Sequence, residues 1–364
     1  MSPTPGVYVE EVLSAGLTVS VSLTAVPALI GDFADVSDGA AVVSSWLDYL
    51  DRFPAAKDDA TALPASALRG YFHNGGGRCY LVSTGGRTLD EALADVEKFP
   101  DVTILVAPGL WDQGEETAGQ WAQALTAYAA GHQAMAVLHA GRDHTPEQAK
   151  AAVDAWNLDG RYAAVYHPWL LPVGGQSTEA LPPSPVVAGT WCRSDAERGV
   201  WKAPANITLR GYAPLQRVSD TQHEEGQPVN FIREFQGRGA VVWGARTMAA
   251  EHDRDSRYIP VRRLVNSVER DVTAMLRFAV FEPNTAPTWT QARSAIDAYL
   301  HNIWQQGGLM GSRPEEAYFV QVGEGITMTQ DDIAAGHLIV KIGLAPVRPA
   351  EYIILQFIQE VGQG

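Results

Sequence analysis

The chain has 364 residues, 46% of them hydrophobic, which is enough for a large core and excludes a wholly disordered protein. Its 27 Lys and Arg against 42 Asp and Glu give a formal net charge of -15, and such a chain repels phosphate backbones, which argues against nucleic-acid binding. Only 19% of the residues are charged, below the ~25% typical of soluble domains, which points to surface hidden in an assembly.

The cysteines and the ends of the chain exclude several further classes. Cys79 and Cys192 are far apart and match no metal-binding spacing, so we expect two buried thiols and no zinc site. No Lys or Arg precedes Arg52, which argues against a secretory signal. No run reaches the ~18 apolar residues of a membrane helix. We therefore expect no metal, no cofactor, no membrane insertion, and synthesis in the cytoplasm.

The N-terminal end has the pattern of β-strands. Residues 7–12 are a short β-type run, and residues 17–24 alternate strictly between apolar and polar side chains. The apolar and strand-forming positions are Val7, Tyr8, Val9, Leu17, Val19, Val21 and Leu23. Since an isolated strand leaves its backbone groups unpaired, this segment needs a sheet with which to pair.

The middle of the chain alternates between strand and helix patterns. Strands are predicted at Val26–Gly31, Cys79–Val82, Val102–Val106, Ala134–His139, Arg161–Tyr166 and Val241–Gly244. Capping boxes at Thr88 with Glu91 and at Thr145 with Gln148 predict helix starts, and residues 115–130 form another helix. This alternation predicts a largely parallel sheet covered by helices. Residues 167–214 are rich in Pro and Gly, so we expect a loop-rich insertion or a domain edge there.

The last third has a different character. Apolar residues at helical spacing predict a long helix over residues 261–279. Thr288 with Gln291 indicates the start of a second helix, which ends at Gly307 and Gly308. Strands follow at Phe319–Val322 and Leu338–Leu344. After Pro346 and Pro349 the chain ends in another strand-like run whose apolar positions include Ile353, Leu355 and Phe357.

Together these patterns predict an α/β fold with two domains and two terminal arms. The parallel-rich outer domain spans residues 24–245, and an α+β C-terminal domain spans residues 246–345. The N-terminal arm covers residues 1–23 and the C-terminal arm residues 346–364, both as extended β-strands.

Candidate catalytic and ligand-binding motifs have simpler structural interpretations. The Gly-rich run His73–Arg78 precedes a strand and lacks a following helix, so it predicts a tight turn. The acidic group around Asp253 lacks the spacing of a calcium loop, which favours a surface ion-pair network. Polar residues such as Asp112, His144 and His167 follow predicted parallel strands, where an α/β enzyme would bind its ligand. No nucleophile elbow and no metal-binding His pair accompany them, so we predict no catalytic residues.

Six segments, in order along the chain, resemble the sheath proteins of contractile phage tails and contractile injection systems. They are Pro5–Glu11, Phe72–Val82, Val229–Arg233, Val242–Thr247, Tyr258–Arg263 and Phe281–Asn284. One departure is Met248, where the family usually has Leu.

The resemblance implies a structural role. Sheath subunits stack as six-fold rings around an inner tube, with baseplate and tail-terminator proteins as further partners. The terminal strands of each subunit reach into neighbours and pair with a sheet in their C-terminal domains, which agrees with the strand patterns at both ends. The assembly shortens to drive the tube through a target envelope. We expect assembly in the bacterial cytoplasm and a place in the tail of a phage or phage-like particle, released in some cases. The alternatives are an α/β enzyme with oligomerisation arms and a static tail or capsid component.

By the same resemblance the tube-facing surface lies in the C-terminal domain. The candidate helices cover residues 262–278, 288–306 and 329–335. The charged candidates on them are Arg262, Arg263, Arg293, Asp331 and Asp332. The sequence leaves open which helix contacts the tube.

Overall fold

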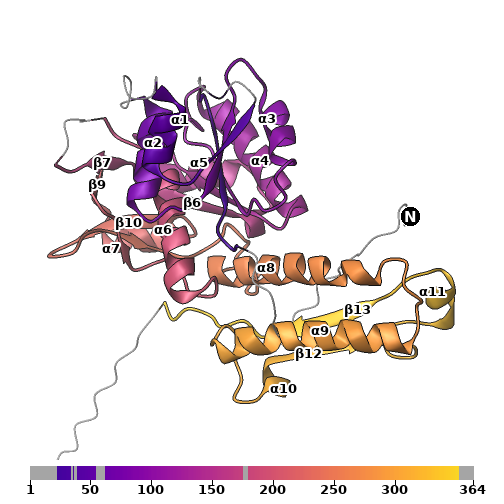
Figure 1. Ribbon diagram of the computed structural model, residues 1–364. Helices are drawn as coiled ribbons and strands as arrows, with labels where there is room; N and C mark the ends of the chain where they lie inside the picture. Colours follow the sequence, from indigo (N-terminus) through magenta and orange to yellow (C-terminus); the bar gives the residue numbers. More distant parts are fainter. Residues whose placement is uncertain (1–22, 34–35, 37–38, 55–61, 175–178, 352–364) are drawn as a thin grey trace, which may run out of the picture.

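The computed structural model describes residues 23–33, 36, 39–54, 62–174 and 179–351. It has a large α/β domain and a smaller, elongated C-terminal domain that begins with helix α8 (Ile259–Met275), as Figure 1 shows. Most of the two predicted arms, residues 1–22 and 352–364, lies outside the described residues, including nine of the ten arm residues named above. The tenth, Leu23, is 61% exposed.

The large domain is built on a nine-stranded sheet in the order β2-β3-β1-β4-β5-β6-β10-β11-β8. Its centre, from β3 to β10, is parallel, and β2, β11 and β8 pair antiparallel at the two edges. The strands are β1 (Pro27–Gly31), β2 (Ala40–Val43), β3 (Cys79–Ser83), β4 (Ile104–Val106), β5 (Met135–His139), β6 (Ala163–His167), β8 (Ile207–Thr208), β10 (Asn230–Phe235) and β11 (Gly239–Trp243). Every strand predicted in this domain is present, with ends that agree within two residues; the one predicted from Arg161 begins at Ala163, after a 3₁₀ turn.

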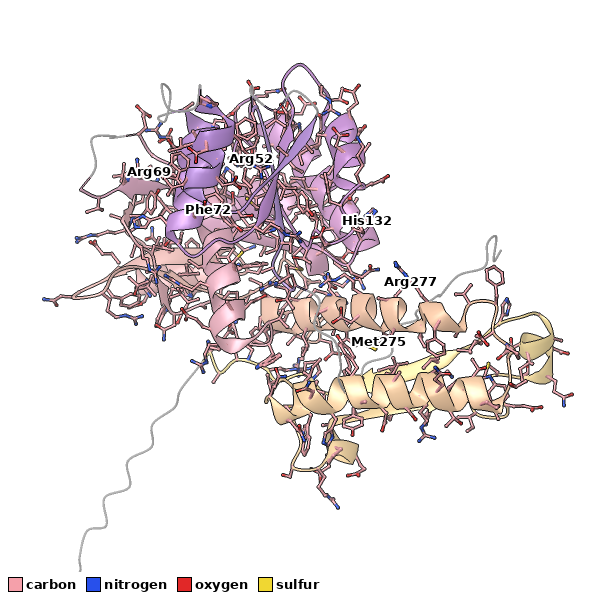
Figure 2. All side chains as sticks on the ribbon, in the orientation of Figure 1. Arg52, Arg69, Phe72, His132, Met275 and Arg277 are labelled. Atoms are coloured by element: carbon pink, nitrogen blue, oxygen red, sulfur yellow. The ribbon has the colours of Figure 1, made fainter. Side chains whose placement is uncertain are left out.

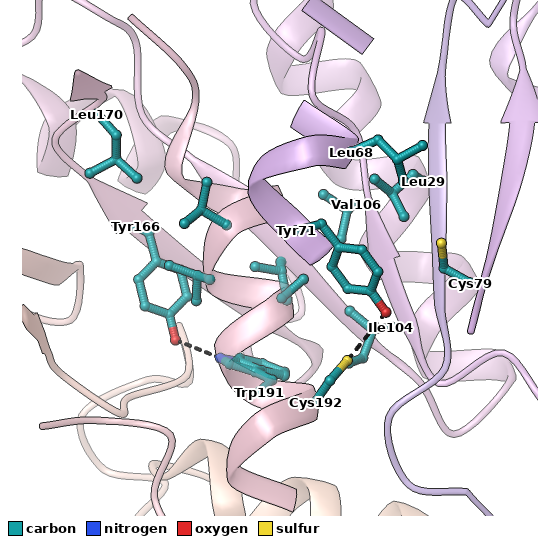
Figure 3. Packing of buried hydrophobic residues seen from close by; sticks show 14 of the residues in the cluster. Leu29, Leu68, Tyr71, Cys79, Ile104, Val106, Tyr166, Leu170, Trp191 and Cys192 are labelled. Atoms are coloured by element: carbon teal, nitrogen blue, oxygen red, sulfur yellow. Dashed lines mark hydrogen bonds between the residues drawn. The ribbon is translucent and has the colours of Figure 1, made fainter. Parts of the chain in front are cut away.

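Helices cover both faces of this sheet, and each face has its own core. On β1, Leu29 points to the face covered by α1, α2 and α6, whereas Ala28 and Ile30 point to the face covered by α3, α4 and α5. Figure 3 shows the first of these cores, where Trp191 of α6 donates to the Tyr166 hydroxyl at 3.1 Å. The helices of this domain are α1 (Trp46–Arg52), α2 (Leu63–His73), α3 (Leu89–Val96), α4 (Glu115–Gly131), α5 (Pro146–Ala155), α6 (Pro183–Arg198) and α7 (Asp220–Glu225).

Local sequence signals correctly predicted where several helices and strands begin. Both predicted capping boxes are present, at the starts of α3 and α5. The Gly-rich run is a turn into β3, with Gly75 at φ +102°. The buried Asn74 holds this turn, because its Oδ1 accepts from the Arg210 backbone N–H at 2.8 Å and its Nδ2 donates to the Gly70 carbonyl at 3.1 Å.

The loop-rich interpretation of residues 167–214 was wrong for its centre, because α6 is a 16-residue helix that is buried over most of its length. Prolines at the start of a helix are compatible with it, since the first N–H groups have no helical partner. A helix that is buried nearly all round also lacks the amphipathic period that a sequence search detects. The rest of the segment contains the short two-stranded sheet of β7 (Leu170–Pro172) and β9 (Tyr212–Pro214).

The C-terminal domain packs two long helices and a small sheet around its own core. After α8 come η3 (Leu276–Ala279), α9 (Ala286–Gln305), α10 (Pro314–Ala317), β12 (Tyr318–Val322), α11 (Gln330–Ala334) and β13 (Val340–Leu344). Leu264 and Val268 of α8 meet Ile296 and Leu300 of α9 in this core. Figure 2 shows Met275 directed toward α9 and Arg277 directed away from it.

The predicted cap of α9 was displaced by three residues. The N-cap residue is Thr285, and Thr288 lies inside the first turn, where its hydroxyl donates to the Pro283 carbonyl at 2.7 Å. Pro287 explains the difference, because its fixed φ suits the first turn and lets the helix begin earlier. The helix ends as predicted, with Gly307 at φ +82°.

Candidate functional site

The carboxyl ends of β5 and β6 are packed with buried histidines. His139 Nδ1 lies 2.8 Å from the Ser184 hydroxyl, and burial lowers the pKa of His139 to about 3. Burial also lowers the pKa of His167 to about 4. Their rings pack edge-on against Trp169 and Phe231. These imidazoles are neutral at pH 7 and act in packing; among the described residues no group of three or more His, Cys, Asp or Glu is placed to hold a metal ion.

Both cysteines are buried free thiols, as predicted. Cys192 lies 3.4 Å from the Tyr71 hydroxyl (Figure 3), and burial raises the pKa of Cys192 to about 11. Burial likewise raises the pKa of Cys79 well above its usual value. Because only a thiolate is a good nucleophile, both side chains are unreactive at neutral pH.

The sheet of the C-terminal domain has two strands with open outer edges. β12 and β13 pair antiparallel with Val320 opposite Ile342, and within the described residues neither strand has a second strand partner. Their apolar side chains, Val320 and Leu344 among them, face the core beneath. A short sheet with one covered face and two open edges is a template onto which further strands add by backbone hydrogen bonds.

The N-terminal arm emerges from a buried ion pair between the two domains. Asp195 of α6 accepts from Arg263 Nη1 at 2.9 Å and Nη2 at 2.7 Å, and from the Thr24 hydroxyl at 2.5 Å. Arg263 Nη2 also lies 3.2 Å from the Thr24 carbonyl, and its guanidinium lies 4.6 Å from the Trp191 ring centroid. We call Thr24, Asp195 and Arg263 the N-terminal anchor.

The C-terminal arm is also held where it leaves the body. Glu351, the last described residue, accepts from Arg246 Nη2 at 2.5 Å and Nε at 3.0 Å, and from the Tyr258 hydroxyl at 3.2 Å. We call Arg246, Tyr258 and Glu351 the C-terminal anchor. Three residues earlier, Arg348 pairs with Asp255, and residues 347–351 form one wall of a groove of about 870 Å³ between the domains.

The five charged candidates for a partner surface have different environments. Arg262 and Arg263 are 3% and 4% exposed, so the expectation that they face outward was wrong. The reason is that α8 is covered on both sides: its apolar stripe meets α9, while Arg262 lies over the Tyr162 ring at 5.1 Å and Arg263 binds Asp195. In contrast, Arg293 and Asp331 are exposed.

Asp332 is half-buried and has a structural task. Its carboxylate accepts from the Thr329 backbone N–H at 2.8 Å and completes the capping box of α11, which lowers its pKa. Asp331 and Asp332 thus form the acidic first turn of this short helix.

Sequence reasoning gave no role to three of the six anchor residues, Thr24, Asp195 and Glu351. Thr24 is only the last residue of the alternating run 17–24, Asp195 and Glu351 stand in no recognisable motif, and the partners of these residues are up to 239 positions away. Arg246 and Tyr258 did stand in segments singled out from the sequence, although nothing local showed what they bind.

The described helices include none with the length and apolar character needed to cross a membrane. In comparisons with known proteins, a family model described as "Phage tail sheath protein central domain" matches residues 85–248. A second, "Phage tail sheath C-terminal domain", matches residues 251–360.

Individual relatives agree with these matches. The tail sheath protein of Vibrio phage KVP40 is 26% identical over 178 residues, which cover 46% of this chain and 26% of that protein. The chain thus spans well under half the length of this curated relative. The sheath of an extracellular contractile injection system (the PVC sheath complex in its contracted state) is 43% identical, with a TM-score of 0.80 and 99% of both chains covered. The contracted helical sheath of the anti-feeding prophage is 39% identical, with a TM-score of 0.77, covering 99% of this chain and 100% of that one.

Proposed function

The chain belongs to the contractile tail sheath family, and from this premise we propose that it is the structural subunit of a contractile sheath. The subunits stack as six-fold rings around an inner tube, between a baseplate and a tail-terminator protein. Contraction drives the tube through a target envelope. The sheath is assembled in the bacterial cytoplasm as part of a phage tail or a phage-like particle.

The observation that carries this proposal is the two-stranded sheet of β12 and β13 with its open edges. Strand-patterned arms at both ends of the chain supply the complementary parts, because an arm from each of two neighbours would extend this sheet on both sides. A backbone hydrogen bond contributes only about 1 kcal/mol net. Two added strands with several bonds each, repeated over every subunit, are enough to hold a helical polymer together.

The mechanism needs no bound nucleotide. The sheath is assembled in an extended arrangement of higher free energy, which the tube and baseplate hold. When one end is released, the subunits rotate as rigid bodies into the contracted lattice, and the arms keep neighbours connected during the rotation.

Truncation of the N-terminal arm tests the assembly model. Deletion of residues 1–23 leaves Thr24 and its anchor in place, so we expect a folded, soluble subunit that forms no sheaths by electron microscopy. A sharper version replaces Val19 and Val21 with Pro, which removes two backbone donors from the arm. Its matched control replaces the same residues with Ile. Sheaths formed by the truncated or the Pro variant would refute pairing by this arm.

For contact with the tube we propose the exposed charges of the C-terminal domain, Arg293 on α9 and Asp331 on α11. Arg293→Glu and Asp331→Lys are expected to reduce co-purification of the tube with the sheath while leaving subunit folding unchanged. Arg69→Glu is the control, because Arg69 is exposed on α2 of the large domain (Figure 2). If neither reversal lowers tube recovery below that of Arg69→Glu, these two residues do not contact the tube.

A further inference from the structure

The two anchors meet at one short piece of the molecule, the beginning of α8. Tyr258, which binds Glu351, is the N-cap residue of α8, and Arg263, which binds Asp195 and Thr24, lies five positions later. At 1.5 Å per residue this separation is about 7.5 Å along the helix axis. Both arms therefore depart from places tied to the same end of one helix.

The C-terminal anchor is supported by a motif whose role the sequence alone did not explain. Asn230 holds the backbone of Arg246 on both sides, since its Oδ1 accepts from the Arg246 N–H at 2.8 Å and its Nδ2 donates to the Arg246 carbonyl at 2.7 Å. Arg246 also forms an antiparallel bridge with Tyr258. The backbone that carries Arg246 and Tyr258 is therefore held rigidly. From this backbone the Arg246 side chain makes a strong bidentate contact with the Glu351 carboxylate.

The N-terminal anchor has a similar construction but is buried. The side chains of Arg263 and Asp195 are 3% and 5% exposed and join α8 to α6 across the domain junction. Thr24 is the first residue after the arm, and the pair binds it through its hydroxyl and its carbonyl. Force applied to the arm is therefore transmitted to the Arg263–Asp195 pair before it is transmitted to β1.

We propose that residues 258–263, the N-cap and the beginning of α8, are the junction that transmits force between the two arms of a subunit. Tension that enters through one arm passes from one anchor to the other along about one and a half turns of α8, so that neither hydrophobic core has to carry it. The role of Asn230 and Arg246 is to fix Glu351 to this junction. This inference rests on the proposed sheath function and adds to it the path by which force crosses each subunit.

The first test measures whether Glu351 holds the root of the arm. A nitroxide spin label is attached at Ala350→Cys, an exposed site, while the buried Cys79 and Cys192 stay unlabelled. Loss of a charge-assisted bidentate contact in Glu351→Gln should raise the ratio of mobile to immobile label about tenfold. Glu316→Gln is the matched control, because Glu316 also pairs with an arginine, but this is Arg313 on the same short segment and not an anchor residue. The labelled parent and its Glu351→Gln and Glu316→Gln variants should unfold at the same temperature, which would show that the label reports release of the arm root and not loss of the fold.

The second test asks whether the anchor carries load in the particle. Glu351→Gln and Glu316→Gln sheaths are assembled with tube and baseplate, and continuous and broken sheaths are counted by electron microscopy before and after contraction. We expect both variants to form extended sheaths of normal length and only Glu351→Gln sheaths to break on contraction. An unchanged label spectrum, or Glu351→Gln sheaths that contract as intact as the control, would overturn the proposal. If the unmodified chain forms no sheaths, the proposed function itself fails, and the role in transmitting force fails with it.

Discussion

Of the substitutions proposed for this chain, Arg263→Ala in the buried pair with Asp195 is expected to destabilise it most. Arg263→Ala removes both guanidinium hydrogen bonds of the Asp195 carboxylate and leaves its bond with the Thr24 hydroxyl. This carboxylate is only 5% exposed. Breaking a buried ion pair from one side costs about 3–5 kcal/mol. Loss of the stacking on Trp191 at 4.6 Å adds to this cost. We therefore expect the free energy of unfolding to fall by about 4 kcal/mol.

Urea denaturation of the full chain, followed by tryptophan fluorescence and far-UV circular dichroism, measures this change; coincidence of the two probes tests for a single transition. The double variant Asp195→Leu with Arg263→Met replaces the pair with apolar side chains and should recover most of the loss. Arg313→Ala removes an exposed pair and should change nothing measurable. A loss below about 1 kcal/mol for Arg263→Ala, or a double variant no more stable than the single one, would refute the reasoning.

Two further stability predictions follow from the large domain. His139 and His167 have folded-state pKa values of about 3 and about 4, below the ~6.5 of histidine in the unfolded chain. The unfolded state therefore binds more protons than the folded state below pH ~6.5. The free energy of unfolding should fall by about 4 kcal/mol as the pH is lowered from 7 to 5. Urea titrations at the two pH values should show this loss, and His139→Gln should remove about half of it; equal stability at both pH values contradicts the assignment. Gly189→Ala places a Cβ 2.3 Å from the Tyr71 carbonyl and should destabilise by about 1–3 kcal/mol. Gly131→Ala, with open space around its Cβ, should be neutral or slightly stabilising, and similar thermal unfolding of the two variants would argue against tight α2–α6 packing.

The sequence by itself determined the features that depend on neighbours a few residues away. Alternation of apolar runs and amphipathic stretches identified five of the six parallel strands, β1, β3, β4, β5 and β6, and the antiparallel strand β11, but it missed the parallel strand β10 and the edge strands β2 and β8. The boxes at Thr88 and Thr145 located two helix starts. Such signals work because capping bonds and the period of side chains are local properties of the chain. The resemblance in ordered motifs was likewise readable from the sequence, and the family it indicated is the one that the comparisons show.

Only the tertiary structure decided which charged side chains are exposed on the surface and which are buried and join the two domains. Arginines on an amphipathic helix are normally exposed, so the sequence placed Arg262 and Arg263 outward. They are buried because a second domain covers that side of α8 and supplies Asp195 from 68 residues away. The helix α6 escaped detection for the same reason, since burial on all sides removes the polar face that reveals a helix. The contact of Glu351 with Arg246, 105 residues apart, depends on the path of the whole chain, and no local pattern encodes it.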